Sequence, residues 1–324
     1  GARQNNLKNI SVDIPLECLV VVSGVSGSGK STLMKEVLVN DIQIQLGMGG
    51  KKGDYDSVDF PKSLVQHIEL IDQNPIGKSS RSNPVTYLKA YDEIRELFSR
   101  QKLAKHLKLQ PKHFSFNVDG GRCNECKGEG VTTVSMQFMA DIELVCETCH
   151  GSRFKSEILE VKFDEKNIAD ILHMTIDEAI DFFEKNREAK IVSKLRPLQD
   201  VGLGYLQLGQ SSSTLSGGEA QRMKLASFLV KGSATEKTLF VFDEPSTGLH
   251  FHDINKLMKS LQSLIELGHS VLVIEHQPDI IKSADWVIDI GPEAGKNGGE
   301  IIFCGTPEDL ATCSLSHTAK YIAD

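Results

Sequence analysis

The chain has 324 residues, which is long enough for one large domain or for two to three of ordinary size. Its hydrophobic fraction of 40% and charged fraction of 25% are typical of a soluble globular protein with an ample core. The longest apolar runs, such as 18–22, hold about five residues, whereas a membrane-spanning helix needs roughly 20. The net charge of −8 argues against a protein that coats nucleic acid with bulk positive charge. Because the chain starts without a secretory signal or an initiator Met, we expect a cytoplasmic protein and a piece of a longer chain.

The N-terminal part alternates between strand-like and helix-like patterns, as an α/β unit does. A short β-branched run predicts a buried parallel strand, and a glycine-rich turn leads from it into a helix. A second strand and a long helix with apolar residues at helical spacing follow. The predicted elements are a strand at 18–23, a helix at 31–40, a strand at 67–71 and a helix at 86–109 with Leu88, Tyr91, Leu97, Phe98 and Leu103 on one face.

The middle of the chain changes character, because 111–165 is rich in Cys and Gly and holds only short strand-like pieces. A helical pattern returns at 168–194, and the last third predicts strands at 238–242, 270–274 and 286–290 with a helix at 254–267. This layout predicts an α/β core that is split by a long insertion and then completed. We expect the core in residues 1–75 and 201–324, and the inserted region in 76–200 with a four-cysteine module at 120–155.

The segment from Gly24 to Ser31 matches the phosphate-binding pattern G-x-x-x-x-G-K-[ST] in full. It follows a predicted strand and opens a predicted helix, so backbone N–H groups of the loop and the helix N-terminus can cradle phosphate oxygens. Lys30 would neutralise the β- and γ-phosphates of ATP, and the Ser31 hydroxyl would ligate Mg²⁺. The residues that we expect to bind ATP and Mg²⁺ in this segment are Gly24, Ser26, Gly27, Gly29, Lys30, Ser31 and Thr32.

The apolar strand at 238–242 ends in two carboxylates, Asp243 and Glu244. Asp243 is suited to hold Mg²⁺ directly or through water, and Glu244 to polarise the attacking water as a general base. Two acids at the end of a strand are a weak signal alone, but the phosphate-binding loop earlier in the chain strengthens it.

Seven cysteines are an odd number for a disulfide framework, and four of them form two CxxC pairs. The pairs Cys123/Cys126 and Cys146/Cys149 are separated by 19 residues, the spacing of a zinc-ribbon-like site. The four thiolates fill a tetrahedral Zn²⁺ shell, so we interpret His150 as a neighbour and not a ligand. A redox role for the CxxC pairs is the alternative, and Cys18 is interpreted as a core residue.

Further motifs resemble those of ATP-binding-cassette (ABC) ATPases. The string 215–219 (LSGGE) resembles their signature motif, 243–249 (DEPSTGL) their Walker B and D-loop, Gln73 their Q-loop glutamine and His276 their switch histidine. The resemblance implies catalytic roles for Glu244, Lys30, His276 and Gln73. It also implies that Ser216, Gly217, Gly218 and Glu219 bind the ATP held by another module. Because the chain carries one copy of each motif, an active site then requires a second copy, either elsewhere in a longer chain or in a homodimer.

The four-cysteine insertion between Q-loop and signature resembles the family of A subunits of the bacterial UvrABC excinuclease. The resemblance runs from the first residues to GTPEDL near the end and fits the C-terminal of that family's two ABC modules. It implies ATP-dependent recognition of damaged double-stranded DNA in nucleotide excision repair, as a dimer that loads UvrB and has no nuclease site. The UvrB-contacting domain would lie outside this sequence. The supporting strings include QNPIGKSSRSNPVTY, GRCNECKGEG, CETCHGSRF, LSGGEAQRMKLA, DEPSTGLHFHD and VIEHQPDIIKSADWVIDIGPEAG.

Eleven Lys and Arg against five Asp and Glu give 78–127 a local charge of +6, which a solvated helical face also explains. If this region contacts DNA phosphates, we expect Lys78 and Arg81 to be among the contacts, near Ser79, Ser82 and Asn83. Arg122 and Lys127, with Arg153 and Lys155, are weaker candidates. Three other functions stay open: a UvrA-like paralogue in drug tolerance, a transporter's ATP-binding subunit, and a non-catalytic zinc interaction module.

Overall fold

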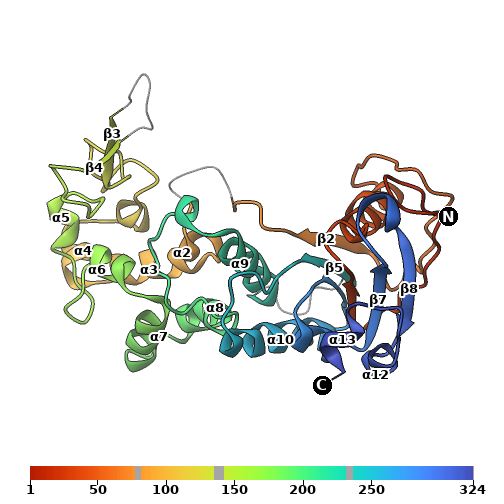
Figure 1. The fold of residues 1–324 in the computed structure, drawn as a ribbon. Coiled ribbons are helices and arrows are strands. Elements are labelled where there is room, and N and C mark those ends of the chain that lie inside the picture. Colours follow the sequence, from red (N-terminus) through yellow and green to blue (C-terminus); the bar gives the residue numbers. More distant parts are fainter. Residues whose placement is uncertain (77–81, 135–141, 231–235, 324) are drawn as a thin grey trace. The chain divides into compact units, whose positions relative to one another are not determined.

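The computed structural model of the protein describes residues 1–76, 82–134, 142–230 and 236–323, which form two compact units. Unit 1 comprises Gly1–Asn74 with Lys231–Asp324, and unit 2 is the intervening Pro75–Val230 (Figure 1). This is the α/β core, split by a long insertion and then completed, that the sequence predicts. Unit 2 ends at Val230 and not at the expected boundary of 200, because the helix that follows the signature motif packs against the preceding helix of unit 2.

Unit 1 is built on a six-stranded sheet in the order β2–β5–β6–β1–β7–β8. Its strands run parallel except β8, which pairs antiparallel with β7 at one edge. The runs that form β1 and β6 are buried throughout, as internal strands of a parallel sheet require. The strands are β1 (Leu19–Ser23), β2 (His67–Ile71), β5 (Thr238–Asp243), β6 (Ser270–Ile274), β7 (Trp286–Gly291) and β8 (Glu300–Gly305).

The predicted strands at 67–71 and 270–274 are confirmed residue for residue, and the other three differ from the structure by one residue at one end. The edge strand β8 was not predicted. Cys18 precedes β1 and is only partly buried against the core of unit 1.

Helices of unit 1 connect and cover these strands. The helix predicted at 31–40 is confirmed as a π-type segment that continues into an α-helix, and Leu33, Met34 and Val37 on it are buried. The helix predicted at 254–267 is confirmed, although it begins three residues earlier and ends one residue earlier than predicted. The helices are η1 (Thr32–Val39), α1 (Asn40–Gln45), α10 (Phe251–Glu266), α11 (Pro278–Lys282), η4 (Gly295–Asn297), α12 (Pro307–Ala311) and α13 (Ala319–Ile322).

Unit 2 consists of short helices and one β-hairpin. In the part of the chain that the structure describes, no helix of either unit combines the length and the apolar character needed to cross a membrane. The elements of unit 2 are α2 (Pro84–Tyr87), α3 (Ala90–Ser99), α4 (Lys102–His106), η2 (Pro111–Phe114), β3 (Val131–Val134), β4 (Ile142–Val145), α5 (Ser156–Leu159), α6 (Ile168–His173), α7 (Ile176–Lys185), α8 (Ala189–Asp200), η3 (Ser212–Thr214) and α9 (Gly217–Val230).

The single helix predicted at 86–109 is wrong, because this stretch is divided among α2, α3 and α4. Lys89 adopts a left-handed conformation with φ 56°, which separates α2 from α3. Gln101 is extended and separates α3 from α4. Leu103 is 37% exposed and does not share the buried face, whereas the other four residues predicted there are buried.

The helical pattern predicted at 168–194 is confirmed, and it is divided among α6, α7 and the start of α8. Thr175 caps α7: its Oγ1 accepts the Glu178 N–H at 3.2 Å, and Glu178 Oε2 accepts the Thr175 N–H at 2.8 Å. This reciprocal pair starts a new helix. Arg187, with φ 60°, lies between α7 and α8.

Aromatic side chains form the core beside the cysteine-rich part of unit 2. The Phe116 ring lies 5.2 Å from Tyr91 and 6.4 Å from Phe154, centroid to centroid. The Tyr91 hydroxyl donates a hydrogen bond to the Phe114 carbonyl at 2.7 Å. These contacts attach the cysteine-rich segment to α3, so that it does not depend on its own few residues for packing.

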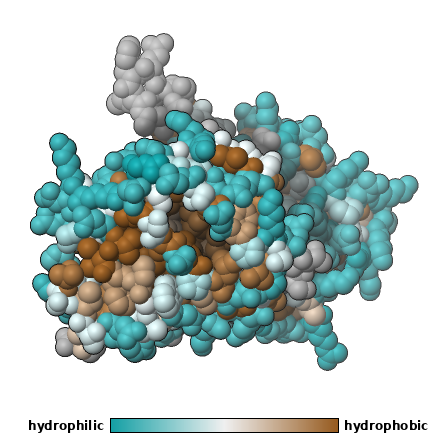
Figure 2. Space-filling model, turned by 90° about the vertical axis from the view of Figure 1, so that its right-hand side faces the viewer, coloured by the Kyte–Doolittle hydropathy of each residue, from teal (hydrophilic) through white to brown (hydrophobic). Residues whose placement is uncertain are grey.

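A cavity of about 480 Å³ opens in unit 1 beside the N-terminal segment and η1. Hydrophobic side chains gather on this side of the unit, as Figure 2 shows. The residues that line the cavity include Ile10, Ile14, Met34, Val37, Tyr55 and Phe60. The residues that we expect to bind ATP are not among those that line it, so the cavity is separate from the candidate nucleotide site.

Candidate nucleotide site and metal centre

The phosphate-binding loop connects β1 to η1, as its pattern predicts. Gly24 has φ 127°, and a Cβ added to it would lie 2.0 Å from the carbonyl oxygen of Ile290. Only glycine fits this close approach to the neighbouring strand β7. Gly27 and Gly29 also have positive φ, at 77° and 116°. The loop therefore has the backbone turns that a phosphate cradle needs.

Lys30 lies inside this loop and is 5% exposed. Its Nζ donates hydrogen bonds to the carbonyl oxygens of Gly24 at 2.9 Å and Val25 at 2.8 Å. Burial lowers the pKa of the Lys30 ammonium, although the nearby charge of Glu244 acts in the opposite direction. A desolvated ammonium beside glycine-rich backbone has the chemistry that binds phosphate oxygens.

The ends of β5 and β6 bring the acidic residues and the histidine together. These strands are parallel neighbours with Asp243 opposite Ile274, so their carboxyl ends meet at one edge of the sheet. Glu244 has φ 49°, and its N–H donates to the Ile274 carbonyl at 2.9 Å. Backbone strain of this kind concentrates at functional sites. The Nε2 of His276 lies 3.5 Å from Glu244 Oε1, so the structure pairs two residues that we predict to be catalytic.

The electrostatic surroundings of His276 favour its neutral form. Burial lowers the pKa of its imidazole, and the positive charge of Lys30 lowers it further, while Glu244 opposes both effects. A neutral imidazole can donate a hydrogen bond from one nitrogen and accept one at the other. Such a group can orient a carboxylate or a phosphate without adding a full charge.

Other predicted nucleotide ligands lie on the same unit. Ser31 directly precedes η1 and is exposed, and Thr32 begins that segment. Gln73 is half-buried and follows β2, which pairs with β5. Asp243 forms an ion pair with Lys35 of η1. Gly24, Ser26 and Gly27 lie in the loop between β1 and η1, together with Gly29 and Lys30.

Sequence reasoning missed Glu275, which is 2% exposed and lies between Ile274 and His276. Its carboxylate accepts backbone N–H bonds from Ser246 at 2.9 Å, His276 at 2.8 Å and Gln277 at 3.2 Å. Glu275 thus holds the loop after β5 against the loop after β6. A glutamate directly after an apolar strand was the available signal, but it pointed to no function by itself.

The residues of unit 1 fit ATP and Mg²⁺ by their chemistry. Glycines with positive φ turn the backbone of the loop, Lys30 supplies a cation, and the Ser31 hydroxyl and Asp243 carboxylate are oxygen ligands of the kind that Mg²⁺ prefers. Lys35 also supplies a cation, which contacts Asp243 and was not predicted.

The signature residues lie in unit 2, at the start of α9. Gly217 and Gly218 begin this helix, and Ser216 precedes it. The Ser216 N–H donates to Glu219 Oε2 at 2.7 Å, and the Glu219 N–H donates to Ser216 Oγ at 3.3 Å. This is a capping box, which fixes the serine at the N-terminus of the helix.

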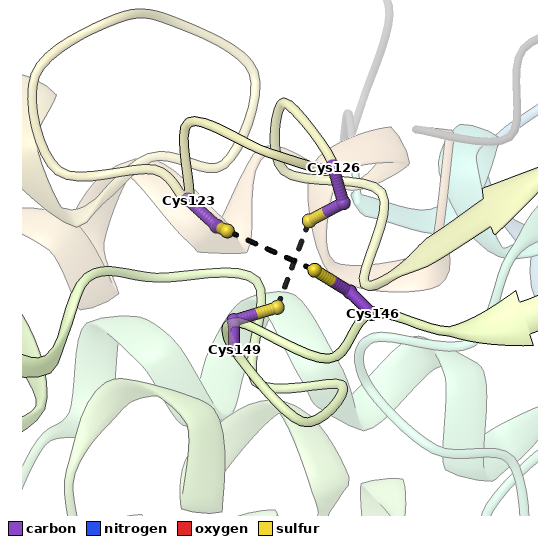
Figure 3. A group of neighbouring side chains, drawn as sticks. All are labelled: Cys123, Cys126, Cys146 and Cys149. Atoms are coloured by element: carbon purple, nitrogen blue, oxygen red, sulfur yellow. Dashed lines mark hydrogen bonds between the residues drawn. The ribbon is translucent and has the colours of Figure 1, made fainter.

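The two CxxC pairs come together at one point of unit 2, as Figure 3 shows. The four thiols are buried, and their Sγ atoms all lie within 4.8 Å of one another. Cys123 and Cys146 are 4.0 Å apart at Sγ, and Cys126 and Cys149 are 3.6 Å apart. None of the four is in a disulfide. Four sulfur ligands at about 2.3 Å in a tetrahedron are separated by about 3.8 Å, so this arrangement fits Zn²⁺.

The backbone around the cysteines supports this geometry. Gly128 has φ 89°, and a Cβ on it would lie 2.0 Å from the Phe116 carbonyl oxygen. The Cys123 N–H donates to the Arg153 carbonyl at 2.9 Å, and the Gly130 N–H donates to Cys126 Sγ at 3.3 Å. Such N–H···S bonds orient the sulfur atoms and stabilise thiolates. His150 is exposed and is not part of the four-thiol group.

The structure gives different surroundings to the candidate DNA-binding residues. Lys78 and Arg81 lie outside the described residues. Lys127 is exposed, whereas Arg122 forms an ion pair with Asp119, its Nη2 lying 2.7 Å from Oδ1. The guanidinium of Arg153 lies 5.2 Å from the centre of the Phe116 ring. Arg153 therefore packs against the aromatic core beside the four cysteines.

Comparisons with known proteins identify relatives along the whole chain. UvrABC system protein A of Staphylococcus aureus (strain COL) is 51% identical over 325 residues, covering 100% of this chain and 34% of that protein. The same protein of Deinococcus radiodurans is 50% identical over 99% of this chain. The crystal structure of UvrA2 from Deinococcus radiodurans matches 99% of this chain and 38% of that chain, with a TM-score of 0.86 and 43% identity. No protein-family model matches. The chain spans about a third of the length of these curated relatives.

Proposed function

Because the chain belongs to the family of UvrABC system protein A, we propose that it hydrolyses ATP as part of a subunit that recognises damaged DNA in nucleotide excision repair. The observation that carries this proposal is the convergence of Lys30, Asp243, Glu244 and His276 in unit 1. The identity to repair proteins along the whole chain favours this function over the ATP-binding subunit of a transporter.

Each residue of unit 1 has a role in this proposal. Lys30 binds the β- and γ-phosphates, while Ser31 and Asp243 hold Mg²⁺, which neutralises charge on the phosphates when it is bound. Glu244 accepts a proton from the attacking water, and His276 orients Glu244 and the γ-phosphate. Gln73 couples the binding and hydrolysis of the nucleotide to the conformation of the insertion that follows it.

The signature residues complete the site of a second module. Ser216, Gly217 and Gly218 are presented at the N-terminus of α9, where backbone N–H groups and the helix dipole favour negative charge. Glu219 holds Ser216 in place through the capping box. In this proposal the second module is another copy of the chain in a homodimer, or a further module of a longer protein.

Unit 2 is the part of the chain that we propose contacts double-stranded DNA. Zinc on the four cysteines keeps the segment 120–155 folded, and the excess of basic residues at 78–127 supplies phosphate contacts. A UvrB-type partner binds the assembled protein. Strand incision belongs to a partner protein.

The test uses purified zinc-loaded chain with ATP and Mg²⁺. Hydrolysis is measured alone, with an intact duplex and with a duplex of the same sequence that carries one bulky lesion, and fluorescence anisotropy gives both DNA affinities. We expect ATP hydrolysis, and tighter binding of the lesion-bearing duplex. Equal affinity for both duplexes would contradict the repair function, and absence of hydrolysis at every protein concentration would contradict the ATPase.

A further inference from the structure

Tyr205 is linked to the signature motif by a chain of hydrogen bonds inside unit 2. Its hydroxyl donates to Glu219 Oε1 at 2.5 Å, and the other carboxylate oxygen accepts the Ser216 N–H at 2.7 Å. The two carboxylate oxygens of Glu219 therefore accept hydrogen bonds from two different groups. One donor is the Tyr205 hydroxyl, and the other is the backbone N–H of Ser216.

The backbone on both sides of Tyr205 is attached to the first turn of α7. The Asp177 N–H donates to the Gly204 carbonyl at 3.0 Å, and the Ile176 N–H donates to the Leu206 carbonyl at 2.9 Å. A Cβ on Gly204 would lie 2.1 Å from Asp177 Oδ1, so this contact is close. Tyr205 thus reaches α9 from a segment that is fixed to a different helix of the insertion.

Electrostatics strengthen the contact between the tyrosine and the glutamate. Partial burial of its hydroxyl and the hydrogen bond to Glu219 raise the pKa of Tyr205 to about 12, so this hydroxyl stays protonated and remains a donor. Burial alone would raise the pKa of the Glu219 carboxyl, but the bonds from Tyr205 and Ser216 outweigh it and leave that pKa below its ordinary value. A neutral donor on a carboxylate forms a charge-assisted hydrogen bond.

The exposure of Tyr205 argues against a role of this side chain in the packing of the core. The residue is 57% exposed, so most of its ring does not contribute buried apolar surface. Its hydroxyl donates a hydrogen bond to Glu219 and also contacts the side chain of Arg222, which lies on α9 as Glu219 does. Replacing the hydroxyl by hydrogen therefore removes polar contacts to α9, the helix that begins at the signature glycines, and leaves the packing of unit 2 in place.

We propose that Tyr205 is a positioning residue for the signature serine, which it holds through Glu219 in a fixed place relative to α7. The proposal rests on the proposed function, in which Ser216 meets the ATP of a second module. Through these hydrogen bonds, a shift of α7 would be transmitted by Tyr205 and Glu219 to Ser216. Tyr205 itself does not contact the nucleotide.

The test compares Tyr205→Phe with Tyr321→Phe in the zinc-loaded chain. Tyr321 is a matched control, because it is 72% exposed and lies on α13 of unit 1. Losing one such bond costs about 1 kcal/mol, so Tyr205→Phe should lower kcat for ATP about five-fold. Titration with a fluorescent ATP analogue should give an unchanged Kd, because the phosphate-binding loop is in unit 1. Tyr321→Phe should change neither quantity.

A second measurement is independent of activity. Hydrogen exchange of the Ser216 amide should become about five-fold faster in Tyr205→Phe, since its acceptor Glu219 is less firmly held. In a Glu219→Ala background, Tyr205→Phe should have no further effect on exchange or on kcat.

Unchanged exchange at Ser216 in Tyr205→Phe would overturn the proposal. So would a loss of kcat of the same size in the Glu219→Ala background, because the hydroxyl would then act by another route. If the wild-type chain did not hydrolyse ATP, the proposed function would fail, and hydrogen exchange would still decide whether Tyr205 holds the signature serine.

Discussion

Lys35 on η1 forms an ion pair with Asp243, the carboxylate that we propose as a ligand of Mg²⁺. Both side chains are mostly covered, with exposures of 30% and 21%. The ammonium neutralises this carboxylate in the absence of a metal ion. A cation that binds Asp243 must therefore compete with Lys35 or share the carboxylate with it.

Replacing Lys35 by Met should therefore lower the Mg²⁺ concentration that gives half-maximal ATP hydrolysis. We expect a shift of about two- to five-fold, since a partly exposed ion pair contributes up to about 1 kcal/mol. The measurement is a Mg²⁺ titration at saturating ATP. Lys237→Met is the control, because Lys237 pairs with Glu17 and neither residue belongs to the proposed site. A higher Mg²⁺ requirement in Lys35→Met would show that the lysine assists the metal and does not compete with it.

Zinc should be present at one ion per chain, bound by the four cysteines. Cys146→Ser should lose the metal and make the segment 120–155 sensitive to protease, because structural zinc supplies about 10–16 kcal/mol at neutral pH. Atomic absorption and limited proteolysis measure the two effects. Cys304→Ser is the control, since Cys304 is an exposed cysteine on β8 of unit 1. Metal-free reduced protein with a protease-resistant segment would contradict the zinc site.

The motifs indicated which of these side chains come together in the fold, and the reason is physical. Phosphate binding and zinc binding each need particular residue types at fixed spacings, and the spacing is visible in the sequence. Buried parallel strands also have nearly continuous apolar runs, which is why β6 was predicted at its observed bounds.

Glu275→Gln should lower the free energy of unfolding of unit 1 by about 1.5–3 kcal/mol, because a buried carboxylate that accepts three backbone N–H bonds loses part of its charge-assisted bonding. Urea denaturation followed by tryptophan fluorescence measures this, since Trp286 begins β7 of the same unit. Glu266→Gln, at the exposed C-terminal end of α10, should be neutral. Equal stability of the two variants would rule out the structural role of Glu275.

The sequence could not indicate the structural role of Glu275 or the points at which the predicted helices break. Glu275 matters because two loops from separate strands meet at its carboxylate, and that meeting depends on the sheet order. Lys89 interrupts the helix by adopting a left-handed conformation, and no Gly or Pro at this position signals the break in the sequence. The capping box of Thr175 and Glu178 was visible in the sequence, but the continuous helical pattern obscured it.

Replacing both Lys78 and Arg81 by Ala should weaken DNA binding alike for all duplex sequences. If both residues contact phosphates, the slope of log K against log salt should fall by about 0.9 for each. Anisotropy titrations across a salt series measure the slope, and ATP hydrolysis without DNA should stay unchanged. Lys282→Ala with Lys320→Ala is a control of equal charge loss in unit 1. An unchanged slope together with lost ATPase activity would instead assign Lys78 and Arg81 to coupling between the nucleotide and the insertion.

We propose that unit 1 hydrolyses ATP with Glu244 as the general base. The most direct measurement is the rate of ATP hydrolysis by Glu244→Gln beside Glu266→Gln, with binding of a fluorescent ATP analogue determined for both. We predict that Glu244→Gln binds nucleotide normally and loses at least about 10²-fold in kcat, as removal of a general base should. Glu266→Gln should match the wild type. Hydrolysis by Glu244→Gln near the wild-type rate would contradict the account.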